Sequence, residues 1–210
     1  MEQPVRMAVF ASHTGTTLQA VLDATAIQQI HARVCLVLSN NSQSMALERA
    51  RLAGIQAAHI SVLQSGSEQQ HDENIYNLLQ KQRIELVLLA GYMKKLSPSL
   101  IAAYPNRILN THPSLLPKFS GRGMYGTRVH RAVIQAKEAY TGATLHVVNA
   151  AYDQGPILDQ EKLPVTTDNA DTLAQEVQRV EKGMLIKNLR RICADLTCLD
   201  RPPGPRSDTH

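Results

Sequence analysis

Short apolar runs alternate with amphipathic stretches through the first half of this 210-residue chain. Residues 86–90 form a continuous apolar run, which is typical of a strand that is covered on both faces. Residues 7–11 and 32–39 have the same character, and the apolar residues of 16–30 between them recur at helical spacing. Strands that alternate with helices predict an α/β fold: a doubly wound, mostly parallel sheet with helices on both faces.

The same patterns extend over the rest of the chain. They predict helices at 44–53, 68–82, 98–104, 129–136 and 168–191, and strands at 57–60, 107–110, 144–149 and 158–165. We expect one domain over residues 1–192. Residues 193–210 contain three prolines and few apolar side chains near their end, and we expect them to form a flexible C-terminal tail.

Composition limits the class of partner. Hydrophobic residues make up 43% of the chain, and the net charge of +4 is scattered, whereas a nucleic-acid site needs a clustered basic face. The odd number of cysteines (Cys35, Cys193 and Cys198) and the absence of a C-x-x-C motif argue against disulfides or zinc. We therefore expect a cytoplasmic protein that takes small-molecule substrates and binds no nucleic acid, membrane or metal. Its oligomeric state is left open between a monomer and a homodimer.

An amide and an imidazole stand two residues apart after a predicted strand, at Asn110 and His112, and Pro113 follows them. In an extended segment residues i and i+2 point to the same side, so both side chains can face one ligand atom. Asp153 lies in a predicted turn about forty residues later. An amide donor, a titratable ring and an acid suit a reaction in which a carbonyl oxygen becomes negative.

Three segments, LNTHPSLLP, GATLHVV and YDQGPIL, resemble the folate-dependent formyltransferases, and the similarity extends from about residue 7 to residue 191. The resemblance implies a formyltransferase-like fold and direct transfer of a formyl group from 10-formyltetrahydrofolate to a primary amine. It also implies that Asn110 and His112 stabilise the oxyanion, that Asp153 pairs with His112 and relays a proton, and that His146 and Thr144 support them. The best match is to members that act on glycinamide ribonucleotide in purine biosynthesis.

The loop between the first strand and the first helix contains Gly15, Thr16 and Thr17. Backbone N–H groups at a helix start attract phosphate, although a plain N-cap gives the same pattern. The resemblance implies that this loop binds the ribonucleotide phosphate, together with Gly91, Gln178 and Glu181. His13 stands where the family has a glycine, and Thr16-Thr17 replaces Ser-Asn, which leaves the phosphate affinity and the identity of the amine open.

The resemblance places the folate against two segments. Met93, Lys94 and Leu96 line one side of the pterin pocket, and the turn at Asn149 and Tyr152 forms the opposite wall. Lys95 stands where the family usually has an aliphatic residue. The glycine-rich loop 118–126 suggests a mobile lid.

Other functions are left open. The chain starts at its first strand and ends soon after its last helix, which favours a free-standing purine enzyme over family members that carry an added domain. The alternatives are a formyltransferase for an amino sugar nucleotide, a formyl-folate hydrolase and a non-catalytic nucleotide-binding domain. A dehydrogenase is disfavoured because G-x-G-x-x-G is absent. His130, on a predicted helix, is interpreted as a solvated residue outside the catalytic set.

Overall fold

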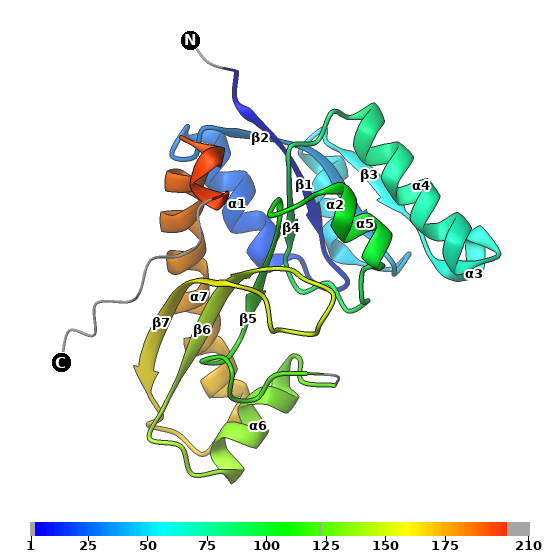
Figure 1. The fold of residues 1–210 in the computed structure, drawn as a ribbon. Helices are drawn as coiled ribbons and strands as arrows, with labels where there is room; N and C mark the ends of the chain where they lie inside the picture. The colour runs from blue at the N-terminus through cyan, green and yellow to red at the C-terminus, as the bar shows by residue number, and fades with distance from the viewer. Residues whose placement is uncertain (1–2, 122, 201–210) are drawn as a thin grey trace.

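The computed structural model describes residues 3–121 and 123–200. Within them, one twisted sheet runs through the centre of the molecule (Figure 1). Its strands in chain order are β1 (Val5–Phe10), β2 (Ala32–Ser39), β3 (Gln56–His59), β4 (Leu86–Leu89), β5 (Ile108–His112), β6 (Tyr140–Val147) and β7 (Ile157–Pro164). The helices are α1 (Thr16–Ala26), α2 (Met45–Leu52), α3 (Val62–Ser65), α4 (Glu68–Lys81), α5 (Pro98–Ala103), α6 (Thr127–Gln135), α7 (Ala170–Ile192) and the 3₁₀ helix η1 (Leu196–Leu199).

The spatial order of the strands is β3-β2-β1-β4-β5-β6-β7. The pairings from β3 to β5 are parallel, whereas β6 and β7 are antiparallel to their neighbours. The predicted doubly wound, mostly parallel sheet is therefore confirmed. The order reverses between β1 and β4, which is the point where ligands bind in open α/β sheets, beyond the carboxyl ends of the strands.

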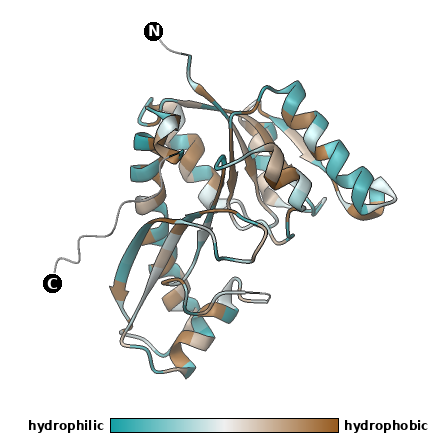
Figure 2. Ribbon diagram, in the orientation of Figure 1, coloured by the Kyte–Doolittle hydropathy of each residue, from teal (hydrophilic) through white to brown (hydrophobic). Residues whose placement is uncertain are grey.

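Two apolar clusters cover the two faces of the sheet. One contains Leu18 of α1 and Leu185 of α7, and the other contains Ile75 and Leu79 of α4 with Leu100 of α5. Figure 2 shows the central strands in brown and much of the outer surface of α4 in teal. This pattern is the expected one for a sheet that is buried on both sides by amphipathic helices.

Several element boundaries differ from the predicted ones. Helix α1 ends at Ala26 rather than residue 30, because Gln28 adopts a left-handed conformation (φ 59°) that starts a turn into β2. Strand β6 begins at Tyr140, four residues before the predicted start, because its antiparallel pairing with β7 extends to Pro164. Strand β5 continues to His112 and so includes both polar residues of its motif. The short helix α3 was not predicted.

The first part of the predicted C-terminal tail packs against the domain. Cys193 is 3% exposed and Leu199 is 5% exposed. Two nitrogens of the Arg107 guanidinium each donate to the Asp200 carboxylate at 2.8 Å. Residues 193–200 are therefore tied to the start of β5, and residues 201–210 lie outside the described part of the chain. No helix within the described residues combines the length and the apolar character that crossing a membrane requires.

Candidate active site

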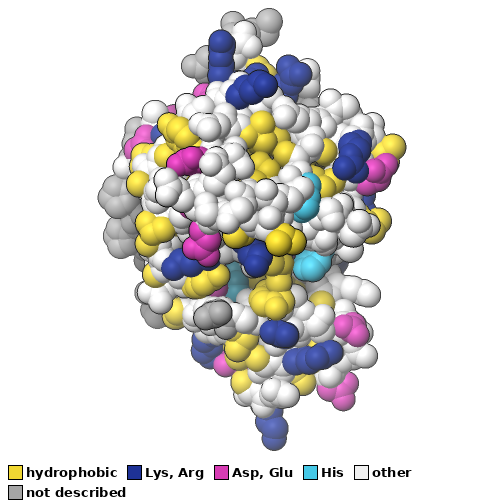
Figure 3. Space-filling model, turned by 90° about the vertical axis from the view of Figure 1, so that its right-hand side faces the viewer, with side chains coloured by type: hydrophobic (Ala, Val, Ile, Leu, Met, Phe, Trp, Pro, Cys, Tyr) yellow, Lys and Arg dark blue, Asp and Glu magenta, His cyan; other side chains and the backbone are white. Residues whose placement is uncertain are grey.

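A cavity of about 760 Å³ opens beyond the carboxyl ends of β1, β4 and β5. Figure 3 views the molecule from the right-hand side of Figure 1 and shows histidine and hydrophobic side chains near the middle of that face, with basic side chains scattered around them. All of the predicted site residues except Thr144 line the cavity: Gly15, Thr16, Thr17, Gly91, Met93, Lys94, Leu96, Asn110, His112, His146, Asn149, Tyr152, Asp153, Gln178 and Glu181. Thr144 is fully buried behind it.

Asn110 is oriented by a histidine on the neighbouring strand. The antiparallel register of β5 and β6 places Asn110 directly opposite His146. Burial lowers the pKa of His146, and Nδ1 of the neutral ring donates to the Val147 carbonyl at 3.0 Å. Nε2 is then an acceptor, and the Asn110 amide nitrogen donates to it at 3.0 Å. This contact fixes which end of the amide is the donor and leaves its second N–H for a ligand.

His112 lies between an acid and a backbone carbonyl. Its Nε2 donates to the Phe119 carbonyl at 2.9 Å, and its Nδ1 is 3.6 Å from an oxygen of Asp153. The side chains of His112 and Asp153 are 5% and 10% exposed. Asp153 is also 3.7 Å from Nε2 of His146. The structure thus brings the amide, the imidazole and the carboxylate to one wall of the cavity, and their chemical roles stay predictions.

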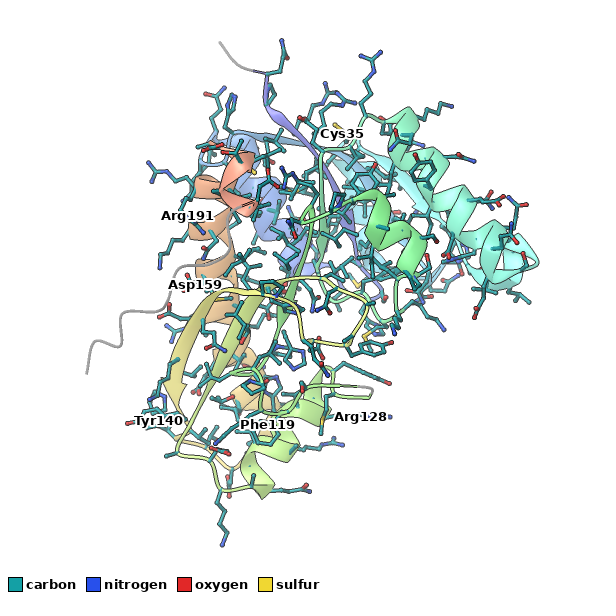
Figure 4. The ribbon with its side chains drawn as sticks, in the orientation of Figure 1. Cys35, Phe119, Arg128, Tyr140, Asp159 and Arg191 are labelled. Atoms are coloured by element: carbon teal, nitrogen blue, oxygen red, sulfur yellow. The ribbon has the colours of Figure 1, made fainter. Side chains whose placement is uncertain are left out.

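The loop that was predicted to be a lid contacts both of these side chains through its backbone. Phe119 has a left-handed conformation (φ 55°) and supplies the carbonyl that His112 meets. The Gly121 N–H donates to the Asp153 carboxylate at 3.0 Å. In Figure 4 the labels of Phe119 and Arg128 mark this loop and the start of α6, which it leads into. The sequence motif gave no signal for these backbone contacts.

The glycine before α1 is required by packing as well as by conformation. Gly15 has φ 66°, and a Cβ placed on it would lie 2.8 Å from Cα of Ala46 in α2. The backbone therefore comes close to a neighbouring helix rather than only to a ligand. Gly91 also has a positive φ, of 71°, and its carbonyl accepts a hydrogen bond from Ser12 N at 3.1 Å. That bond ties the loops after β1 and β4 together at the switch point.

Helix α7 places two polar side chains against α1 and β5. The Gln178 amide donates to the Thr16 hydroxyl at 3.0 Å, and Lys182 donates to the Gln178 carbonyl oxygen at 3.2 Å. Glu181 accepts from the hydroxyls of Thr111, at 2.9 Å, and Thr17, at 3.4 Å. Burial raises the pKa of the Glu181 carboxyl, and the two hydroxyls act against that shift. Helix α7 thus supplies an amide and a carboxyl to this end of the cavity, and Lys182 holds the amide from outside the cavity lining.

Both segments that were predicted to hold the folate line the cavity. The Met93 N–H donates to the Ser12 hydroxyl at 2.8 Å, which fixes the segment after β4. The Asn149 side chain accepts from the Ala151 N–H at 3.0 Å and so closes the opposite turn. Lys95 lies over the ring of Tyr152, with its ammonium 5.4 Å from the ring centroid. This cation–π contact joins the two segments.

His130 is a cavity residue that the sequence interpretation placed in solvent, and the structure shows that interpretation to be wrong. It is 3% exposed and lies on the buried face of α6 beside Val129 and Val133. Burial lowers its pKa to about 4, with a smaller contribution from the charge of His112. The helical spacing of apolar residues around position 130 was the available signal. In the described residues, no cluster of three or more His, Cys, Asp or Glu side chains could hold a metal.

Residues 5–189 match the family model described as formyl transferase. The chain is 33% identical over 195 residues to the chloroplastic phosphoribosylglycinamide formyltransferase of Arabidopsis thaliana, with 90% of this chain and 66% of that protein covered. The match therefore spans just under two thirds of the length of that relative. Identity to the phosphoribosylglycinamide formyltransferase of Escherichia coli strain K12 is 34% over 181 residues, with 86% and 83% covered.

A solved structure supports the same similarity. The crystal structure of glycinamide ribonucleotide transformylase 1 from Symbiobacterium toebii superimposes with a TM-score of 0.86 at 34% sequence identity. The match covers 92% of this chain and 90% of that one. The segment that matches the family model, residues 5–189, includes every described residue that lines the cavity.

Proposed function

Since this chain belongs to the formyl transferase family, we propose that it transfers a formyl group from 10-formyltetrahydrofolate to the amine of glycinamide ribonucleotide, a step of purine biosynthesis. The observation that carries this proposal is the meeting of Asn110, His112 and Asp153 at one cavity wall. A cytoplasmic location and a monomeric or homodimeric state stay predictions.

The proposed reaction is direct transfer. The substrate amine attacks the formyl carbon, and the formyl oxygen becomes an anion. The second amide N–H of Asn110 donates to that oxygen because His146 already holds the first. The imidazolium form of His112 carries an N–H on each nitrogen, so Nδ1, which is 3.6 Å from Asp153, can donate to the oxyanion while Nε2 stays on the Phe119 carbonyl.

A proton must leave the attacking amine, and one must reach the folate nitrogen as the carbon–nitrogen bond breaks. Asp153 is the carboxylate beside His112, and it is 10% exposed, so it can pass the proton through a water within the cavity. The transfer needs no nucleophilic side chain, and we expect no covalent intermediate. No metal takes part in the proposed reaction.

The ends of the cavity suit the two substrates. Around the start of α1, the backbone N–H groups and the Gln178 amide favour a phosphate group, and the Lys182 ammonium that is bonded to Gln178 adds positive charge nearby. Glu181 faces the same end and can accept from an amine. The segment 91–96 and the turn 149–153 form opposite walls for the flat pterin of the folate.

An amino sugar nucleotide is the second candidate acceptor. The observation that favours it is His13, which is exposed at the cavity where the family has a glycine. An imidazole at this position changes both the space and the hydrogen-bonding groups around the phosphate. The acceptor therefore has to be chosen by experiment.

The test is a spectrophotometric assay with a 10-formyl folate donor in three arms: glycinamide ribonucleotide, an amino sugar nucleotide, and water alone. We expect turnover in the first arm, and a fall of about 100- to 1000-fold in kcat for Asn110→Ala. Asn74→Ala, on the exposed surface of α4, is the matched control and should keep full activity. Turnover only with the amino sugar would favour the second candidate, turnover only with water would indicate a hydrolase, and no turnover would refute formyl transfer.

A further inference from the structure

A row of three polar side chains crosses the antiparallel part of the sheet. His112 of β5 pairs with Thr144 of β6, and Thr144 pairs with Gln160 of β7. Directly opposite residues in antiparallel strands share a face of the sheet, so the three side chains form one line. His112 lines the cavity, whereas Thr144 and Gln160 are not among the described residues that do so.

Thr144 uses all of its hydrogen-bonding capacity behind the cavity. It is fully buried, and its hydroxyl donates to the Ser114 carbonyl at 2.6 Å. The same oxygen accepts from the Leu116 N–H at 3.1 Å and from the Gln160 amide at 2.9 Å. One hydroxyl therefore holds two backbone groups of the segment that follows His112, and Gln160 orients that hydroxyl.

Gln160 and Ser114 complete the clamp. The Gln160 amide also donates to the Leu116 carbonyl at 2.9 Å, so Leu116 is held at both its N–H and its carbonyl. The buried Ser114 hydroxyl donates to the Lys118 carbonyl at 2.7 Å. The next residue, Phe119, presents the carbonyl that accepts from Nε2 of His112. The segment thus leaves His112, is clamped by β6 and β7, and returns to the imidazole ring.

We propose that Thr144 and Gln160 are positioning residues that hold segment 114–119 in place, so that the Phe119 carbonyl keeps the His112 ring facing Asp153. The proposal rests on the proposed function of the cavity. An imidazole can rotate about two side-chain bonds, and its orientation is set by what each nitrogen meets. If the clamp is released, the carbonyl moves, and the ring is free to turn away from the carboxylate.

Two substitutions remove the clamp while keeping the shape of the side chains. Thr144→Val replaces the hydroxyl by a methyl group, and Gln160→Met removes the amide on the half-buried strand β7. Thr144→Ser keeps the hydroxyl and should restore function. Thr141→Val is the matched control: Thr141 lies on the same strand, is 1% exposed, and its hydroxyl has no hydrogen-bond partner within the described part of the chain.

We expect Thr144→Val and Gln160→Met to lower kcat by about 10- to 100-fold, because a displacement of about 1 Å in a catalytic group has effects of that size. KM for both substrates should change by less than about threefold, since neither side chain lines the cavity. Thr144→Ser and Thr141→Val should keep near wild-type kcat. Each variant is assayed below its own unfolding temperature.

Two outcomes would overturn the proposal: wild-type kcat in the variants that lack the clamp, or an equal loss in Thr141→Val, which would indicate general destabilisation of the strand. The ¹⁵N and ¹H resonances of the His112 ring give a readout that does not need turnover, and they should shift in Thr144→Val but not in Thr141→Val. If Thr144→Val does not fold, Gln160→Met decides the matter by both readouts. If the wild-type protein shows no formyl transfer, the proposed function fails, whereas the resonances still test the positioning.

Discussion

The buried His130 should make the stability of the protein depend on pH in a defined window. Burial lowers the pKa of this imidazole from 6.5 to about 4 in the folded state. In the unfolded chain the ring is hydrated and has its ordinary pKa. As the pH falls below about 6.5, the imidazole binds a proton in the unfolded state but stays neutral in the folded state. The free energy of unfolding therefore decreases until the pH reaches about 4, where the folded state also binds the proton.

The size of the effect follows from the two pKa values. Between about pH 8 and about pH 4.5, His130 should lower the free energy of unfolding by about 2.5 kcal/mol, from the difference in proton binding between the two states. His130→Leu removes this contribution. The leucine has a similar volume and suits a helix. It also removes the buried Nδ1 of His130, which has no hydrogen-bond partner within the described part of the chain.

The assay is urea unfolding of both proteins, followed by circular dichroism at the two pH values. At the higher pH the ring is neutral in both states, so the difference between the proteins there reports packing alone and serves as the control. At the lower pH the wild type should have lost about 2.5 kcal/mol more than the variant. A difference between the two proteins that is the same at both pH values would refute the argument that burial keeps this ring neutral.

Four further substitutions test the site and the loops around it. Asp153→Asn should lower kcat by about 10²- to 10⁴-fold with little change in KM, because an amide in place of this carboxylate, 3.6 Å from the His112 ring, cannot take up the proton of the attacking amine; steady-state kinetics with unchanged kcat would count against the pair. Glu181→Gln should raise Tm relative to wild type at pH values above the ordinary pKa range of a glutamate. Because burial raises the pKa of the Glu181 carboxyl, the wild-type protein loses stability as this group ionises, and glutamine does not ionise. Scanning fluorimetry at several pH values measures the difference in Tm between the two proteins, which should disappear in acid. Gly15→Ala should cost about 1–3 kcal/mol in urea unfolding because of its backbone conformation and its contact with α2. Gly91→Ala should cost less: its φ is also positive, but among the described residues other than its chain neighbours, no atom lies within 4 Å of the added methyl group.

Local periodicity accounts for what could be predicted of the fold. The apolar runs at β1, β2 and β4 and the amphipathic helices between them require only neighbouring residues to be recognised, and each of these elements is present. Apart from the short helix α3, which was not predicted, the errors lie at element ends, where a single residue such as Gln28 turns the chain or where pairing lengthens a strand such as β6. Residues 193–200 pack against the domain because Leu199 is buried and Asp200 meets Arg107, a partner 93 residues away.

The same division applies to the site. The sequence alone determined that Asn110 and His112 lie on one side of a strand end, because the side-chain period of a strand is a local property. Only the tertiary structure decided that His146 orients the amide, that the Phe119 carbonyl meets the imidazole, and that His130 faces the interior. These contacts depend on the register of β5 with β6, on the path of a loop that returns to its own start, and on the face of α6 that is packed. Such pairings between distant segments are chosen by burial and hydrogen bonding over the whole domain, and no short stretch of sequence contains that information.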